Sequence, residues 1–157
     1  MNENENSRSL LITILYITIA ILTIFSVSSI IMGIYIVGSN FNFRALLSSV
    51  ILPFIYFFNY LAVVWNLKNI VNTTNTSPFI SDNVLRLKKM GYFLLVNTVL
   101  ELIISLGETK KYIGIGSMQS TLKPVIVMCL IATLICFVIA DVFKKAIKIK
   151  EDNDLTI

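Results

Sequence analysis

The chain has 157 residues, of which 56% are hydrophobic and only 14% are charged, with a mean hydropathy of +0.82 and a net charge of +4. A soluble domain is about half apolar and about a quarter charged, so this shortage of charge argues against a water-soluble fold. Two cysteines, no histidine and no nucleophile–base set or phosphate-binding loop argue against a zinc, haem or redox site and against an enzyme. We therefore expect no cofactor and no metal.

The apolar residues gather in long blocks, and blocks of about 18 or more apolar residues indicate membrane-spanning helices. After a polar segment, 1–9, that we expect to be frayed, the first block runs over 10–37 without a charge. A signal-peptide core is about 7–15 residues long and ends in a small-residue cleavage site, so we interpret this block as an uncleaved helix. Ser29 and Gly33 form a small-xxx-small pair that would let a neighbouring helix approach closely.

The second block covers 45–67 and contains Pro53, which lacks a backbone N–H and predicts a kink. The second half of this block is aromatic, and Trp65 near its end is typical of a membrane interface. We expect a polar loop over 68–78. The lysines and arginines of the chain stand at the ends of the blocks, where they determine topology, so a direct nucleic-acid partner is not expected.

A basic segment precedes the third block, which covers 91–107. Ser81 is a suitable helix N-cap, and Arg86, Lys88 and Lys89 supply the positive charge. We expect this helix to rest on the lipid headgroups before it enters the membrane.

The third block carries a polar stripe formed by Asn97, Glu101, Ser105 and Glu108, which recur on one helical face. Glu101 lies eleven residues past Met90, about 16 Å along the helix axis, near the middle of a membrane core about 30 Å thick. A charged acid there costs about 2.5–3.5 kcal/mol on insertion scales. Two interpretations follow: a proton relay or cation site, or a neutral glutamate that bonds between helices, and we favour the second.

The fourth block covers 124–143, and Asp141 near its end can pair with Lys144 or Lys145 on the next turn. A tail, 144–157, follows. This tail is either a solvated end or a motif that docks in a groove of a cytosolic partner. Its distinctive residues are Glu151, Asp152, Asp154, Leu155, Thr156 and Ile157.

The expected fold is all-α, with one membrane domain over 1–157 that bundles four transmembrane helices. Four spans place both termini on the same side of the membrane. That side carries nine lysines and arginines, whereas the two loops on the other side carry four. The positive-inside rule therefore predicts a multi-pass protein of the cell membrane with both termini in the cytoplasm.

Three stretches of the chain resemble small bacterial four-helix membrane proteins of the domain-of-unknown-function family twenty-nine seventy-five. These stretches are Ser77-Pro78-Phe79, Asn83-Val84-x-Arg86-Leu87-Lys88-Lys89-Met90-Gly91 and Glu151-Asp-Asn-Asp-Leu-Thr-Ile157. The family has no established activity, and its members are often encoded beside a small helix-turn-helix regulator. The resemblance implies a membrane protein that holds or controls a cytosolic regulator, and it assigns no catalytic residue.

Our leading hypothesis is a non-enzymatic membrane protein that binds a cytosolic transcription regulator through its basic segment and tail. The second is a small proton-coupled transporter or channel that uses Glu101. The third is an immunity protein against a membrane-active peptide.

Overall fold

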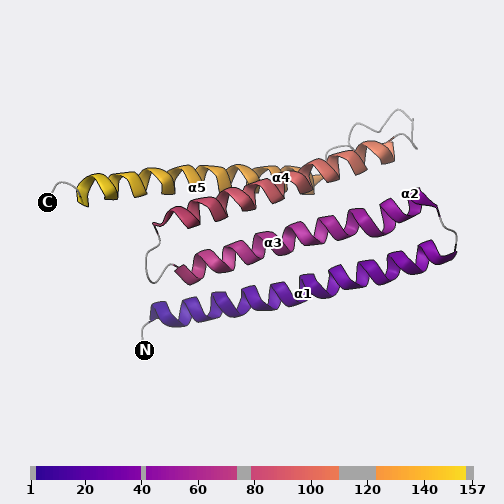
Figure 1. Cartoon of the computed structure of the whole chain (residues 1–157), viewed down its shortest axis with the longest axis horizontal. Coiled ribbons are helices and arrows are strands. Elements are labelled where there is room, and N and C mark those ends of the chain that lie inside the picture. The colour runs from indigo at the N-terminus through magenta and orange to yellow at the C-terminus, as the bar shows by residue number, and fades with distance from the viewer. Residues whose placement is uncertain (1–2, 40–41, 74–78, 110–122, 155–157) are drawn as a thin grey trace. The chain divides into compact units, whose positions relative to one another are not determined.

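The computed structural model describes residues 3–39, 42–73, 79–109 and 123–154. All secondary structure in these ranges is helical, which confirms the expected all-α class (Figure 1). In chain order the elements are α1 (Glu3–Ser39), α2 (Phe43–Leu46), the π-helix η1 (Leu47–Ile51), α3 (Leu52–Thr73), α4 (Ser81–Thr109) and α5 (Pro124–Asp154).

Four stretches of helix in the described part of the chain are long and apolar enough to cross a membrane. They are Asn6–Gly38, Leu47–Thr73, Ser81–Leu106 and Pro124–Asp154. Large apolar side chains point outward along them: Ile24 is 68% exposed, Ile31 64% and Met128 71%. This distribution suits a solvent of lipid tails, and the expected multi-pass membrane protein with four membrane helices is confirmed.

The helices are longer than the apolar blocks. Helix α1 begins at Glu3, inside the segment expected to fray, and α3 continues to Thr73, inside the segment expected to be a loop. Helix α5 continues to Asp154, so most of the polar tail is helical. A helix satisfies its own backbone hydrogen bonds, so it can leave the membrane core without unwinding.

Contacts divide the chain into two compact units, 1–71 and 72–157, which are described separately. In the first unit, α1 packs against η1 at Gly33. A Cβ atom added to Gly33 would collide with the carbonyl oxygen of Ser49 and lie 2.6 Å from Cγ2 of Val50. Gly33 therefore has the role that the small-residue pair predicts, because only a residue without a side chain allows this approach.

The π-helix marks the place where Pro53 disturbs the second membrane helix. Pro53 has no N–H to donate to Ser49, so the ordinary α-helical bond cannot form there. The backbone N–H of Leu52 instead bonds to the oxygen of Leu47, five residues back. The structure thus has a short π-helical turn at the place where the sequence predicts a kink.

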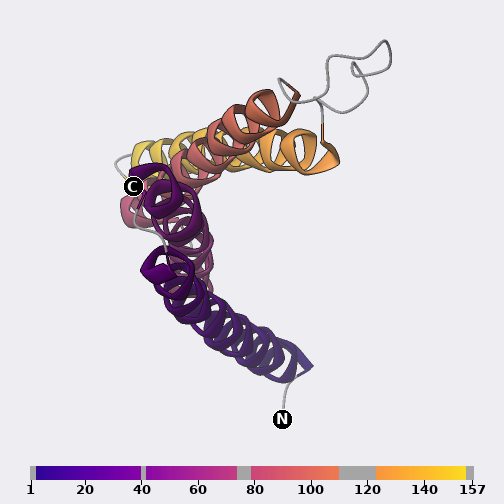
Figure 2. The same cartoon turned by 90° about the vertical axis from the view of Figure 1, so that its right-hand side faces the viewer.

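In the second unit, α4 and α5 form an antiparallel hairpin and lie side by side (Figure 1, Figure 2). The buried residues of α5 recur at alternating steps of three and four, which is the spacing of a close helix–helix seam. They are Ile126, Cys129, Thr133, Cys136 and Ala140. Most of these side chains are small, so the backbones of the two helices can approach closely. Such close packing can hold helices together in lipid, where the hydrophobic effect does not drive them together. Cys129 and Cys136 are buried free thiols.

Candidate functional site

Asn83, whose side chain is fully buried, stabilises the start of α4 by hydrogen bonds. Its Oδ1 atom accepts a hydrogen bond from Thr73 Oγ1 at 3.0 Å and another from Arg86 Nη1 at 3.0 Å. One amide oxygen thus joins the last residue of α3 to the first two turns of α4. Arg86 belongs to the basic segment expected to rest on the lipid headgroups, but it is half-buried and its guanidinium group donates to the buried Asn83.

The rest of this stretch forms one wall of the seam with α5. Val84, Leu87 and Met90 are buried, and a Cβ atom on Gly91 would lie 3.0 Å from the ring of Phe137. Just before α4, the rings of Phe79 and Phe143 are 5.4 Å apart between centroids. One face of the expected headgroup-contacting helix therefore packs on protein, whereas Lys88 and Lys89 are exposed on the other face.

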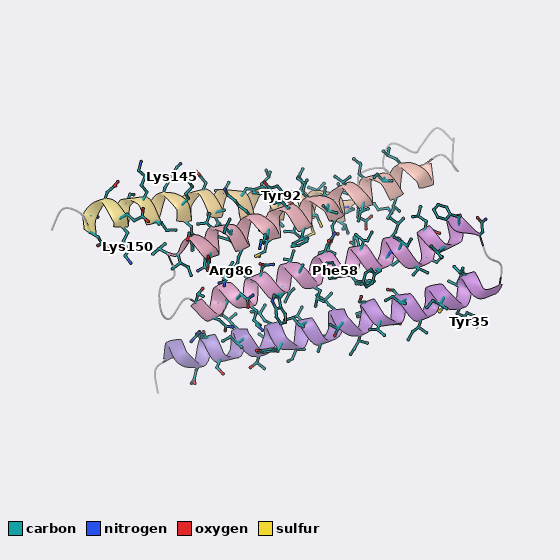
Figure 3. The ribbon with its side chains drawn as sticks, viewed as in Figure 1. Tyr35, Phe58, Arg86, Tyr92, Lys145 and Lys150 are labelled. Carbon is teal, nitrogen blue, oxygen red and sulfur yellow. The ribbon has the colours of Figure 1, made fainter. Side chains whose placement is uncertain are left out.

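The charged ends of α4 and α5 lie together. Asp141 forms an ion pair with Lys145 at 2.9 Å, which confirms the expected pairing one turn apart. The positive charges of Lys144 and of Lys88, on the other helix, also act on Asp141. Figure 3 shows Arg86 in the N-terminal part of α4 and Lys145 and Lys150 in the C-terminal part of α5.

The acidic part of the tail stands on the last turns of α5. Glu151, Asp152 and Asp154 are exposed there, three turns or less beyond Lys144. The final three residues of the predicted motif, Leu155, Thr156 and Ile157, lie outside the described residues. The described charges therefore change sign along one helix, from basic to acidic.

The polar stripe of α4 lies partly in the seam. Asn97 and Ser105 are fully buried, whereas Glu101 between them is half-buried. Counting from the Gly91–Phe137 contact, Asn97 lies between the levels of Cys129 and Thr133 on α5. Within the described residues Glu101 forms no ion pair, and the side chain of Glu108 is outside them. The stripe thus combines two buried neutral side chains with one acid at the edge of the seam.

Thr133 adds a hydroxyl to the same region of the seam. It is 1% exposed, and its Oγ1 atom donates a 2.8 Å hydrogen bond to the carbonyl oxygen of Cys129 on its own helix. A polar side chain inside a membrane helix is tolerated when its proton is bonded in this way.

The burial of one lysine, Lys68, was not predicted from the sequence. Lys68, expected in a loop, is on α3 and is only 8% exposed. Its Nζ atom lies 4.1 Å from the ring centroid of Trp65 and 4.7 Å from that of Tyr16 on α1. The two rings stabilise the ammonium group by cation–π attraction. The one available signal was the Trp-x-x-Lys spacing, which places both side chains on one helical face.

The comparison with protein families decides where the chain belongs. Residues 12–157 match the family described as "Protein of unknown function (DUF2975)". The chain belongs to the DUF2975 family. The resemblance seen in the sequence is therefore confirmed, and it covers nearly the whole chain. No curated protein and no solved structure matches this DUF2975 chain.

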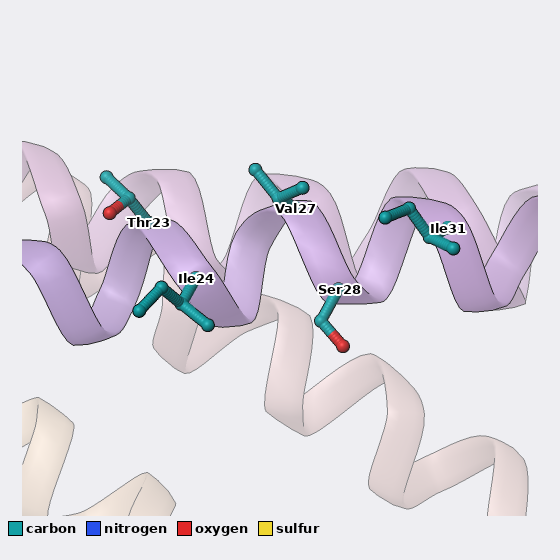
Figure 4. A pocket seen from close by; sticks show the side chains of 5 residues that line it. All are labelled: Thr23, Ile24, Val27, Ser28 and Ile31. Carbon is teal, nitrogen blue, oxygen red and sulfur yellow. The ribbon is translucent and has the colours of Figure 1, made fainter.

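A shallow hollow of about 430 Å³ lies on α1 of this DUF2975 protein and is lined by Thr23, Ile24, Val27, Ser28 and Ile31 (Figure 4). The hydroxyl of Thr23 already donates to the carbonyl oxygen of Ala20 at 2.8 Å. The lining has no ionisable side chain, so it offers no group for acid–base chemistry. In the described ranges of the DUF2975 chain, no group of three histidine, cysteine, aspartate or glutamate residues could hold a metal ion.

Proposed function

We propose that this DUF2975 protein is a non-enzymatic membrane protein that binds a cytosolic regulator of the helix-turn-helix class. The binding surface is the charged end of the α4–α5 hairpin, defined as residues 82–89 and 144–157. The observation that carries the proposal is the continuation of α5, as a helix with exposed charges, from its apolar part to Asp154.

The orientation of the chain supports a cytosolic partner. Four spans place both termini and the 74–80 connection on one side, and that side carries nine of the 13 lysines and arginines. The positive-inside rule assigns this side to the cytoplasm. The hairpin end and the tail then face soluble proteins of the cell.

The geometry of the hairpin end suits recognition. Residues 144–154 extend α5 by about 16 Å at 1.5 Å per residue. The hydrogen bond of Asn83 with Thr73 and the contact of Phe79 with Phe143 hold the neighbouring end of α4 to Thr73 and to α5. A surface that is already ordered loses less conformational freedom on binding than a disordered tail does. Glu151, Asp152 and Asp154 supply charge, and Leu155 and Ile157 supply apolar side chains for a groove.

The experiment is co-purification of a tagged regulator with the full-length protein from detergent-solubilised membranes. Deletion of residues 151–157 is expected to abolish co-purification and to change the output of a regulator-controlled reporter. The matched control is K110Q/K111Q, which removes charges from the segment between α4 and α5 and should retain the regulator. Unchanged binding and reporter output after the deletion would contradict the proposal.

A second candidate function, a proton-coupled transporter or channel, is favoured by one observation. Glu101 lies half-buried between the fully buried Asn97 and Ser105. Ionisable side chains within a membrane helix commonly mark ion or proton pathways. Glu101→Gln keeps the shape and removes the titration, so a pH-dependent flux through reconstituted vesicles should disappear in this variant. A flux that persists would show that the glutamate is structural.

A further inference from the structure

We propose that four exposed lysines at the hairpin end form a binding site for the headgroups of anionic phospholipids. We name them the basic collar: Lys88, Lys89, Lys144 and Lys148. This site does not depend on a protein partner and goes beyond the proposed function.

The position of the collar is fixed by the length of the apolar part of α5. Residues 124–140 carry no charge and are about 25 Å long, close to the membrane core of about 30 Å. Asp141 therefore marks the edge of the core. Lys144 lies about 5 Å beyond it and Lys148 about 10 Å beyond it, along a headgroup layer about 5–8 Å thick. The flexible lysine side chain lets Lys148 reach back into this layer.

The lysines of α4 occupy the same layer. Gly91 contacts the ring of Phe137 on the antiparallel α5, so Lys88, three residues before Gly91, lies near the level of Asp141, and Lys89 is its neighbour. Both side chains are exposed, because the opposite face of α4 packs on α5. Two helices therefore contribute lysines to one level of the membrane.

Among the described residues the charge of the collar is compensated only in part, by the action of Asp141 on Lys88 and Lys144. Asp141 forms its ion pair with Lys145, and the guanidinium group of Arg86 donates a hydrogen bond to Asn83. None of the four collar lysines forms an ion pair with another described residue. The other acids of α5, which are Glu151, Asp152 and Asp154, lie about 15–20 Å beyond Asp141, outside the headgroup layer.

This separation of charge favours a lipid over an acidic protein as the occupant. The positive groups stand at the depth of lipid phosphates, and the negative groups stand in water, where an anionic surface repels them least. Each lysine near an anionic surface strengthens binding by about fivefold. Three lysines together therefore account for a preference of tenfold or more.

The test uses the full-length protein in detergent with equimolar phosphatidylglycerol and phosphatidylcholine, and native mass spectrometry counts the bound lipids. The wild type is expected to prefer phosphatidylglycerol by tenfold or more, and K88Q/K89Q/K144Q is expected to lose most of this preference. K110Q/K111Q/K123Q removes the same number of charges elsewhere and should keep it, as should K88R/K89R/K144R. Deletion of residues 151–157 should also leave it unchanged, which separates this result from the proposed function.

The proposal is overturned if the wild type shows no preference, if the collar variant keeps it, or if the control loses it equally. Collar-dependent binding of a DNA duplex without any lipid preference would likewise overturn it. Elution volume and melting temperature establish that each variant is folded. If the triple variant does not fold, K89Q and K144Q are measured singly, and each should weaken the preference by about fivefold.

Discussion

Thr73 Oγ1 donates a 3.0 Å hydrogen bond to Oδ1 of Asn83, which joins the last residue of α3 to the first turn of α4. The same oxygen accepts the guanidinium group of Arg86. Because Asn83 is fully buried, these bonds are shielded from competition by water. They join the first turns of α4 to Thr73.

Removing the amide of Asn83 should destabilise the second unit. Asn83→Ala leaves both donors without their acceptor, which is expected to lower the free energy of unfolding by about 1–3 kcal/mol. Chemical unfolding in mild detergent measures the effect. Thr73→Val should be additive with Asn83→Ala only if the two side chains do not interact, so we expect a coupling energy in the double-mutant cycle.

Thr98→Val is the matched control for the threonine substitution. Its hydroxyl donates to the carbonyl oxygen of Leu94 on its own helix, so it links no two helices. We expect a change within about 0.5 kcal/mol. A loss as large as that of Thr73→Val would contradict the special role of the α3–α4 bond.

Gly33→Ala should separate α1 from η1. The new methyl group would collide with the carbonyl oxygen of Ser49, and backbone cannot move aside as a flexible side chain can. Overpacking of this kind costs about 1–3 kcal/mol. Gly38→Ala is the control, because among the described residues no atom beyond the neighbouring backbone of its own helix lies within 4 Å of its added Cβ atom. The comparison fails if both variants melt at the same temperature.

The cation–π contacts of Lys68 predict that the effect of replacing Trp65 depends on whether Lys68 is present. Trp65→Leu should destabilise the wild-type protein by about 1–2 kcal/mol, because the ammonium group loses one of its two rings. In a Lys68→Met background the same substitution should have a smaller effect, since no cation remains to be stabilised. Equal effects in the two backgrounds would show that Trp65 contributes only apolar packing.

Because the buried residues of α5 that face α4 are mostly small, we expect larger side chains at these positions to destabilise the protein. Ala140 is completely buried, so Ala140→Leu should force the two helices apart and cost about 1–3 kcal/mol. Val138 is 63% exposed on the same helix, and Val138→Leu should change little. Thermal unfolding of the two variants in the same detergent compares them directly.

The four membrane helices could be predicted from the sequence because lipid solvent demands long apolar blocks. Ala140 and Cys136 lie inside such a block whatever their partners are. The start of α5 at Pro124 and the ion pair of Asp141 were also predictable, because both depend on neighbours within one or two turns.

Other features depend on partners distant in the sequence. Lys68 looks like the beginning of a polar loop until Tyr16, from another helix, covers it. In the sequence Arg86 is indistinguishable from the neighbouring basic residues, and only the structure shows that its guanidinium group donates to the buried Asn83. The sequence indicates where a charged residue lies along the chain, but it does not indicate which aromatic ring or amide the charged group will contact.

We propose that the charged hairpin end of this four-span protein faces the cytoplasm, and the accessibility of single cysteines tests this orientation. Cys129 and Cys136 are replaced by alanine, and a single cysteine is introduced either at Asn153 or at Ser117, on the two sides of α5 in the sequence. A membrane-impermeant maleimide should label the Ser117→Cys protein in intact cells and the Asn153→Cys protein only in inverted membrane vesicles. Labelling of both proteins from one side, or the reverse pattern, would contradict the account.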